Sequence, residues 1–152
     1  MTSPAIEVKE PIIHPGKIMV SYRHSAGIAG SRFLRGLQKK KILGIRCHAC
    51  NRVYVPPQIV CPECYNQLDE WVELDGRGTL LTYTVIYYSL PVHPVDPPFI
   101  IGSILVDGAD TALGHLISEV EINSLEIGMV VEPVFKETPE GNILDIKYFR
   151  PV

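Results

Sequence analysis

The residues most able to do chemistry are four cysteines, which form two CxxC pairs, Cys47 with Cys50 and Cys61 with Cys64. Each tight turn of this kind presents two sulfur ligands to one ion, and two such turns complete a tetrahedral thiolate shell. The spacing favours zinc, although a rubredoxin-type iron site uses the same geometry. Because four thiolates leave no open coordination position, we predict a structural metal rather than a catalytic one.

Other cysteine chemistry fits this sequence less well. Disulfides are disfavoured, because the amino-terminal residues carry acids and prolines instead of a secretory signal pattern. A thioredoxin-like redox pair needs a single CxxC in a βαβ setting, and a thiol nucleophile needs a cysteine that no metal holds. His48 lies inside the first pair, and since four thiolates already fill the shell, we expect it beside the site or at the surface.

The elements that must position these cysteines are short. Residues 1–30 show no periodicity and contain several prolines, so we expect an extended arm with a loop of small residues at 25–30. Ser31 can cap a short helix over 31–41, which has one apolar face and ends in three lysines. Short strands at 42–45 and 53–55 then lead into and out of the first CxxC pair, as in a zinc ribbon.

The rest of the chain has the composition of β structure. Runs rich in β-branched and aromatic residues alternate with turn residues, and the proline-rich segment 91–98 cannot continue a strand. Five strands in so short a stretch favour a small closed barrel, of which the OB-fold is the commonest. The expected strands cover residues 78–90, 99–106, 111–117, 129–135 and 143–149. We therefore predict a mainly β fold in three parts: an arm (1–30), a helix with a rubredoxin-like zinc ribbon (31–70) and an OB-fold (71–152).

Charge is unevenly distributed along the chain. Residues 11–62 contain nine Lys or Arg and no acid, whereas residues 63–152 contain fifteen acids and four bases. A cationic end attracts phosphate, whether it belongs to a nucleic acid or to a phosphorylated cofactor. No apolar run approaches the length of a membrane span, so we expect a cytoplasmic protein without membrane contact.

No catalytic constellation stands out. The sequence lacks the GxSxG, P-loop, HExxH and GxGxxG motifs, and its remaining histidines are scattered. We expect His93 at the surface and His115 on a buried face with Leu113 and Ile117. Two functions stay open on these grounds: a nucleic-acid-binding zinc-ribbon/OB module, and a non-catalytic accessory subunit that holds a phosphorylated ligand or docks on an enzyme. The acidic barrel half argues against the first.

A series of short motifs runs in order from residue 31 to residue 150. Beside the cysteines, it includes 33–37 (FLRGL), 42–47 (ILGIRC), 53–57 (VYVPP), 76–79 (GRGT), 82–84 (TYT), 98–102 (PFIIG) and 127–130 (IGMV). Together they resemble the family of zinc-ribbon/OB-fold proteins associated with acyl-CoA enzymes. One departure is Asn51, where a glycine commonly follows the second cysteine, and this puts the geometry of that turn in question.

The resemblance implies a division of labour. The four cysteines would bind structural Zn²⁺, and catalysis would belong to a thiolase-fold partner in a hetero-oligomer, so that no activity is expected of this chain alone. Members of the family also accompany an archaeal acetoacetyl-CoA thiolase/3-hydroxy-3-methylglutaryl-CoA synthase assembly and hydratase or aldolase partners. CoA carries phosphates that Arg and Lys bind well. From their position in the cationic segment, the candidates for contacting CoA are Arg32, Arg35, Lys39, Lys40, Arg46 and Arg52.

Overall fold

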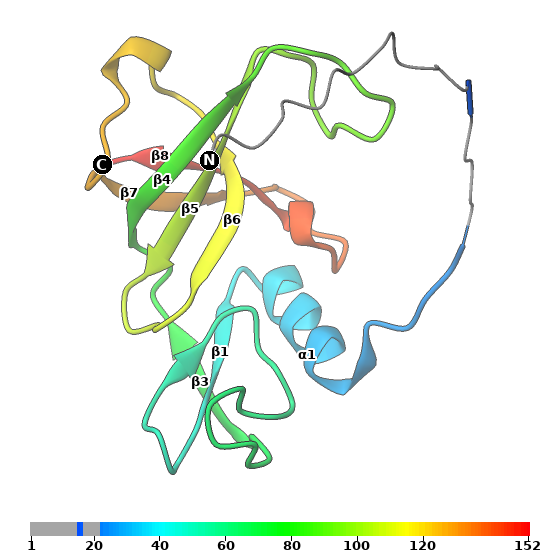
Figure 1. Ribbon diagram of the computed structural model, residues 1–152, viewed down its shortest axis with the longest axis vertical. Helices are drawn as coiled ribbons and strands as arrows, with labels where there is room; N and C mark the ends of the chain where they lie inside the picture. The colour runs from blue at the N-terminus through cyan, green and yellow to red at the C-terminus, as the bar shows by residue number, and fades with distance from the viewer. Residues whose placement is uncertain (1–14, 17–21) are drawn as a thin grey trace, which may run out of the picture.

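Strands dominate the part of the chain that the computed structural model describes, residues 15–16 and 22–152 (Figure 1). A helix and a small three-stranded sheet lie at one end, and a closed five-stranded barrel forms the rest. The elements are α1 (Gly27–Gln38), β1 (Ile42–Arg46), β2 (Val53–Tyr54), β3 (Glu70–Leu74), β4 (Gly78–Ile86), β5 (Phe99–Val106), β6 (Ala112–Ile117), β7 (Val130–Phe135) and β8 (Ile146–Pro151), with short 3₁₀ turns η1 (Ile122–Ser124) and η2 (Ile143–Asp145). The predicted mainly β class with an OB-fold barrel is confirmed.

Helix α1 is displaced from its predicted range. It begins at Gly27, where the Ser25 hydroxyl accepts a hydrogen bond from the Gly27 amide at 3.2 Å, so Ser31 is not its cap. It ends at Gln38, and Lys40 adopts a positive φ of 59° in the turn that follows. The expected helix over 31–41 and loop over 25–30 were therefore wrong at their boundaries. Most of the predicted arm, residues 1–14 and 17–21, lies outside the described residues.

The three-stranded sheet has the order β2-β1-β3, with both pairs antiparallel. Strand β1 is central, and Ile42 pairs with Leu74 at one end while Arg46 pairs with Glu70 at the other. Strand β3 was not predicted from the sequence, because two of its five residues are glutamates and none of the five is fully buried. Its strand conformation depends on pairing with β1 and not on its own composition.

The barrel closes in the order β4-β5-β6-β8-β7, with β7 returning to β4 where Gly78 faces Val131. Strand β4 ends at Ile86, four residues before its predicted end, and a long loop over 87–98 follows it. The last strand begins at Ile146 instead of residue 143, because η2 occupies residues 143–145. In Figure 1 the 87–98 loop extends from the end of the barrel farthest from the small sheet.

One apolar core joins the helix to the barrel. Phe33 and Leu37 of α1 pack in the same buried cluster as Ile42, Leu80 and Phe149. The ribbon is also hydrogen-bonded directly to the barrel. Four bonds of 2.8–3.0 Å link the backbones of Val53 and Val55 with Asp110 and Thr111, on the turn between β5 and β6. These contacts fix the small sheet on the barrel.

The helix α1 has 12 residues. Within the described ranges, no helix is both long enough and apolar enough to cross a membrane.

Asp145 is a buried carboxylate that closes the turn before β8. Its oxygens accept hydrogen bonds from the amides of Glu140 (2.8 Å), Gly141 (2.6 Å) and Asn142 (3.1 Å). Burial alone would raise the pKa of Asp145, but these amides outweigh it and lower the pKa below its usual 3.8. The carboxylate is thus the charged acceptor that holds this turn together.

We expect Asp145→Ala to lower the free energy of unfolding by at least ~1–3 kcal/mol, since an unsatisfied buried donor costs about that much. Asp145→Asn keeps one oxygen acceptor and should cost less. The pKa of Asp145 in the folded protein lies below 3.8. The extra free energy of unfolding of the wild type relative to Asp145→Asn is therefore complete above pH 3.8 and declines as the pH falls through the folded pKa. Denaturant unfolding followed at several pH values measures both effects, with Glu137→Ala as the exposed-carboxylate control.

Candidate metal centre

The two CxxC pairs form two turns of the same construction. In the first, the Asn51 amide donates to the Cys47 carbonyl at 2.7 Å and the Cys47 amide donates to the Arg52 carbonyl at 2.8 Å. In the second, the amides of Tyr65 and Cys61 donate to the carbonyls of Cys61 and Asn66, each at 2.9 Å. Each turn ends on a residue with positive φ, 54° at Asn51 and 60° at Tyr65.

This geometry resolves the question raised by Asn51. A left-handed backbone conformation favours glycine, and asparagine is among the side chains that tolerate it best. The turn therefore keeps the shape that a glycine would give it. In the second turn a tyrosine adopts the same conformation, so the backbone geometry of both turns is set by closure around the cysteines.

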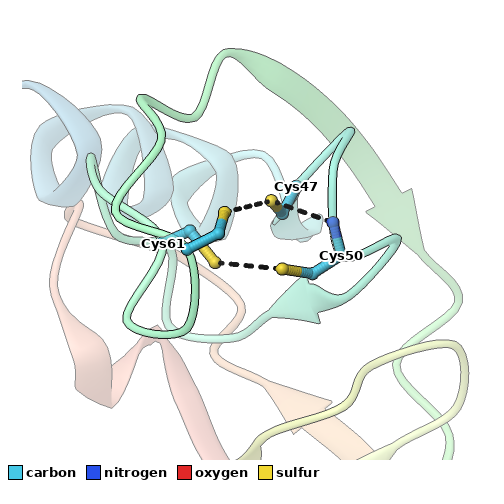
Figure 2. A group of neighbouring side chains, drawn as sticks. Cys47, Cys50 and Cys61 are labelled. Atoms are coloured by element: carbon cyan, nitrogen blue, oxygen red, sulfur yellow. Dashed lines mark hydrogen bonds between the residues drawn. The ribbon is translucent and has the colours of Figure 1, made fainter.

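The four sulfurs converge on one point, and all lie within 4.8 Å of one another (Figure 2). Cys47 Sγ is 3.5 Å from Cys64 Sγ, and Cys61 Sγ is 3.9 Å from Cys50 Sγ. A tetrahedral ion with metal–sulfur bonds of about 2.3 Å holds its sulfurs about 3.8 Å apart. No disulfide links these cysteines. The donor set and its spacing therefore fit one tetrahedral thiophilic ion, with Zn²⁺ as the predicted occupant.

Hydrogen bonds lower the pKa of one of the four thiols. The buried Tyr54 hydroxyl lies 3.2 Å from Cys61 Sγ. Burial opposes ionisation of Cys61, but the hydrogen bonds from Tyr54 and from the amides of Cys64 and Glu63 lower its pKa to about 6. Hydrogen bonding to Cys64, followed by burial, raises the pKa of Cys50 to about 12. A metal bound at neutral pH must therefore displace protons from the cluster.

The role of Tyr54 was not foreseen from the sequence. Val53 and Tyr54 were predicted as strand residues between the two cysteine pairs, and that strand is confirmed as β2. The available signal was the position of Tyr54, seven residues before Cys61, because a buried tyrosine hydroxyl needs a hydrogen-bond partner.

His48 takes no part in the sulfur cluster. Its ring contacts two carboxylates, Asp69 at 3.4 Å and Glu70 at 3.2 Å, and its side chain is mostly exposed. The four sulfurs alone make up the group of convergent metal-ligating atoms found in the described residues. The prediction that His48 lies at the surface beside the site agrees with this placement.

Two of the six predicted cationic contacts are paired with acids of the ribbon. Arg52 Nη1 lies 2.8 Å from Glu63, which is inside the second CxxC pair, and Arg46 Nε lies 3.5 Å from Glu70. Lys41, outside the candidate set, pairs with Glu73 at 2.7 Å. The cationic stretch of the sequence is thus partly neutralised by the acids that begin at residue 63.

The other four cations lie on α1 or just after it. The Arg32 guanidinium stacks 4.3 Å above the ring of Trp71. Arg35 faces solvent from α1, and Lys39 and Lys40 follow its last residue. Among the described residues, Arg35, Lys39 and Lys40 make no ion pair. They remain the predicted cations best placed to meet an outside anion.

His115 is the buried histidine of the barrel, as predicted. The Leu116 amide donates to Nδ1 at 2.9 Å, so Nε2 carries the proton and donates to the Ile143 carbonyl at 3.1 Å. Burial lowers the pKa of His115 and outweighs both hydrogen bonds, which keeps the ring neutral. With both nitrogens satisfied, His115 is a structural residue.

We expect purified protein to carry one metal ion per chain, and Cys61→Ser to lose it. Removing one thiolate breaks the shell, and structural Zn²⁺ typically contributes ~10–16 kcal/mol, which appears as folding free energy. Elemental analysis identifies the metal as zinc or iron. The fluorescence of Trp71, the protein's single tryptophan, reports the ribbon because its side chain packs on the cysteine cluster.

His48→Ala is the matched control and should keep its metal, because His48 lies outside the sulfur cluster. Acid should release the metal in every variant, since protons compete with it for the thiolates. A Cys61→Ser protein with full metal content and unchanged Trp71 fluorescence would refute the four-sulfur site.

Comparisons with known proteins agree with this architecture. The model of the ChsH2 rubredoxin-like zinc ribbon domain matches residues 35–69, and that of the ChsH2 C-terminal OB-fold domain matches residues 71–136. The solved structure titled "Ltp2-ChsH2(DUF35) aldolase" shares the fold, with a TM-score of 0.65 and 24% identity over 85% of this chain and 98% of that one.

Two curated relatives extend the comparison. A DUF35 domain-containing scaffold protein of Methanocaldococcus jannaschii is 28% identical over 116 residues, which cover 73% of this chain and 82% of the relative. A probable enoyl-CoA hydratase alpha subunit of Thermomonospora curvata is also 28% identical over 116 residues, but these span only 34% of that protein. The two models match in order, so residues 35–69 form a ChsH2-type rubredoxin-like zinc ribbon domain and residues 71–136 a ChsH2-type OB-fold domain, and the chain is similar to DUF35 proteins.

Proposed function

We propose that this chain is a non-catalytic, zinc-binding scaffold subunit of an acyl-CoA enzyme. The observation that carries the proposal is the closed cluster of four sulfurs on a ribbon that is hydrogen-bonded to the barrel. A metal with four thiolate ligands has no open position for substrate, so its contribution is to hold the ribbon in shape. The named relatives, a scaffold protein and an enoyl-CoA hydratase subunit, support the same class of function.

For the partner, we propose a thiolase-fold subunit that cleaves a β-ketoacyl-CoA with CoA in a hetero-oligomer. The long stretch before Phe33 and its Gly-containing segment resemble the zinc-finger subunit of benzoylsuccinyl-CoA thiolase, from anaerobic toluene degradation. Benzoylsuccinyl-CoA is therefore our first choice of substrate. An acetoacetyl-CoA thiolase/3-hydroxy-3-methylglutaryl-CoA synthase assembly is the alternative within the same class.

In this proposal the cations around α1 line the entrance for CoA. Arg35, Lys39 and Lys40 have no ion-pair partner among the described residues, so they can meet phosphate without first losing one. Arg46 and Arg52 would have to exchange Glu70 and Glu63 for phosphate. We therefore rank the cations of α1 and its end above those beside the metal centre.

The test of the proposed function is affinity capture of the tagged full chain from its native host at moderate salt. We expect an acyl-CoA enzyme at a near one-to-one ratio, identified by mass spectrometry. Capture of nucleic acid that is released by added salt would instead support the binding-module function. Recovery of the chain without any enzyme would refute the scaffold proposal.

In the captured complex, we expect Lys39→Ala/Lys40→Ala to raise the apparent KM for acyl-CoA about tenfold with little change in kcat. A charge-assisted hydrogen bond is worth about 1.5–3 kcal/mol, and loss of ground-state binding appears in KM. Steady-state kinetics with varied acyl-CoA measures the effect.

Arg52→Ala is the matched control, because Arg52 already pairs with Glu63. It should leave KM close to that of the wild type. A larger KM effect for Arg52→Ala than for the double lysine variant would reverse the proposed ranking.

A further inference from the structure

The loop over 87–98, between β4 and β5, exposes an unusual amount of apolar surface. Val92 is 83% exposed and Tyr87 is 70% exposed, and Tyr88, Leu90 and Val95 also face solvent. Five large exposed apolar side chains thus fall within nine residues of one loop, a higher density than the single exposed residues that any surface carries. Such a segment is typical of an interaction site.

Contacts of His93 fix the conformation of the loop on the barrel. His93 packs edge-on against the buried Phe99 ring, with centroids 5.0 Å apart, and also against Tyr88 at 5.6 Å. Its Nδ1 accepts a hydrogen bond from the Leu90 amide at 3.3 Å, and its own amide donates to the Leu90 carbonyl at 3.1 Å. Four prolines further restrict the backbone. Binding through this loop therefore costs little ordering entropy.

A hollow of about 500 Å³ opens beside the loop. Its lining includes Val95 and Pro98 of the loop, Ile122 of η1 and Tyr148 of β8. The volume accommodates one or two large side chains of a binding partner. The loop and the hollow thus combine a projecting apolar edge with a recess that can receive an anchor residue.

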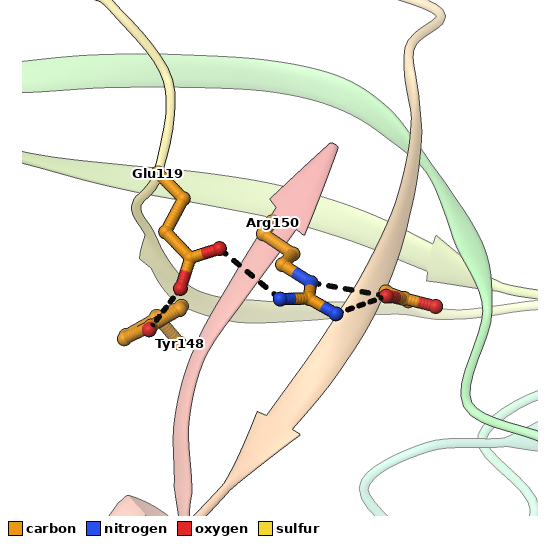
Figure 3. A network of polar contacts seen from close by, with 4 residues as sticks. Glu119, Tyr148 and Arg150 are labelled. Atoms are coloured by element: carbon orange, nitrogen blue, oxygen red, sulfur yellow. Dashed lines mark hydrogen bonds and ion pairs between the residues drawn. The ribbon is translucent and has the colours of Figure 1, made fainter. Parts of the chain in front are cut away.

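Tyr148, in the lining of the hollow, belongs to a polar network (Figure 3). The Tyr148 hydroxyl donates to Glu119, whose other oxygen lies 3.2 Å from Arg150. Arg150 also donates two hydrogen bonds to Glu132 on the neighbouring strand β7, at 2.9 and 3.0 Å. The ring of Tyr148 is therefore held against the hollow by a chain of charged groups across two strands and the segment that precedes η1.

Charge at this surface selects the partner. The hollow carries two carboxylates, Asp96 and Glu121, and one cation, Lys147. The two carboxylates outnumber the single cation, so the lining of the hollow carries a net negative charge. A partner segment with an apolar anchor flanked by Lys or Arg complements both the recess and its rim.

We propose that the 87–98 loop and the adjoining hollow form the docking surface for the catalytic acyl-CoA subunit, which presents an apolar anchor beside a basic residue. This proposal rests on the proposed function, because it assigns the surface through which that scaffold binds its enzyme. It places docking at the end of the molecule away from the zinc ribbon.

The test measures the dissociation constant of the captured enzyme for the immobilised full chain. We expect Val92→Asp to weaken binding at least about tenfold, as loss of an anchor contact does. Tyr87→Ser is a second variant of the same loop and should act in the same direction. Asp96→Lys should also weaken binding and make it less sensitive to salt. Denaturant unfolding and metal content equal to the wild type confirm that the barrel and the ribbon of each variant fold.

Ile28→Asp is the matched control, because Ile28 is 85% exposed on α1 at the other end of the molecule. It should bind within about twofold of the wild type. If the Val92→Asp and Tyr87→Ser chains bind the captured enzyme as tightly as the wild type does, the proposed docking surface is overturned and the proposed function is unaffected. Equal weakening by Ile28→Asp, or self-association of the chain through this loop, would also overturn it. Failure of the wild type to capture any acyl-CoA enzyme would overturn the proposed function itself.

Discussion

Closure of the ribbon depends on four thiol groups held within 4.8 Å of each other. The buried cluster around them is small, comprising Ile45, Tyr54 and Leu68 besides two of the cysteines. So few apolar side chains cannot hold two turns and three short strands together without help. A metal that binds all four sulfurs supplies what the core lacks. The positive φ angles of Asn51 and Tyr65, which cost energy outside glycine, persist because the sulfurs must converge.

The ribbon in turn is positioned by the barrel. Val53 and Val55 are hydrogen-bonded to Asp110 and Thr111, and Val55 belongs to the same buried cluster as Leu80 and Phe149. A disturbance at the metal centre can therefore reach the barrel through β2 and its continuation. A structural metal would hold the ribbon in one shape on the barrel, whereas α1 is fixed to the barrel by the shared core.

The metal ligands and most of the barrel could be predicted from the sequence, because CxxC spacing and alternating β-branched strands are local signals. The boundaries of α1 could not, since its N-cap residue, Ala26, has no capping side chain, and the helix extends N-terminal of Ser31 with Ala29 buried. Strand β3 could not be predicted from its own residues, because its strand conformation depends on pairing with β1. Arg52 pairs with Glu63, eleven positions away, although the two residues fall in the basic and the acidic parts of the sequence.

The separation of charge takes a different form in three dimensions. Acids of the second cysteine pair and of β3 pair with the cations nearest the metal, so the predicted CoA contacts left without an ion pair among the described residues lie on α1 and at its end. The loop over 87–98, with its apolar side chains and the Asp96 carboxylate, lies at the other end of the molecule. A scaffold with two such ends can hold an enzyme through one and face an anionic ligand with the other. Because one core and one set of hydrogen bonds join the two ends, the distance between them is fixed, and a fixed distance lets a non-catalytic chain align a partner with its substrate.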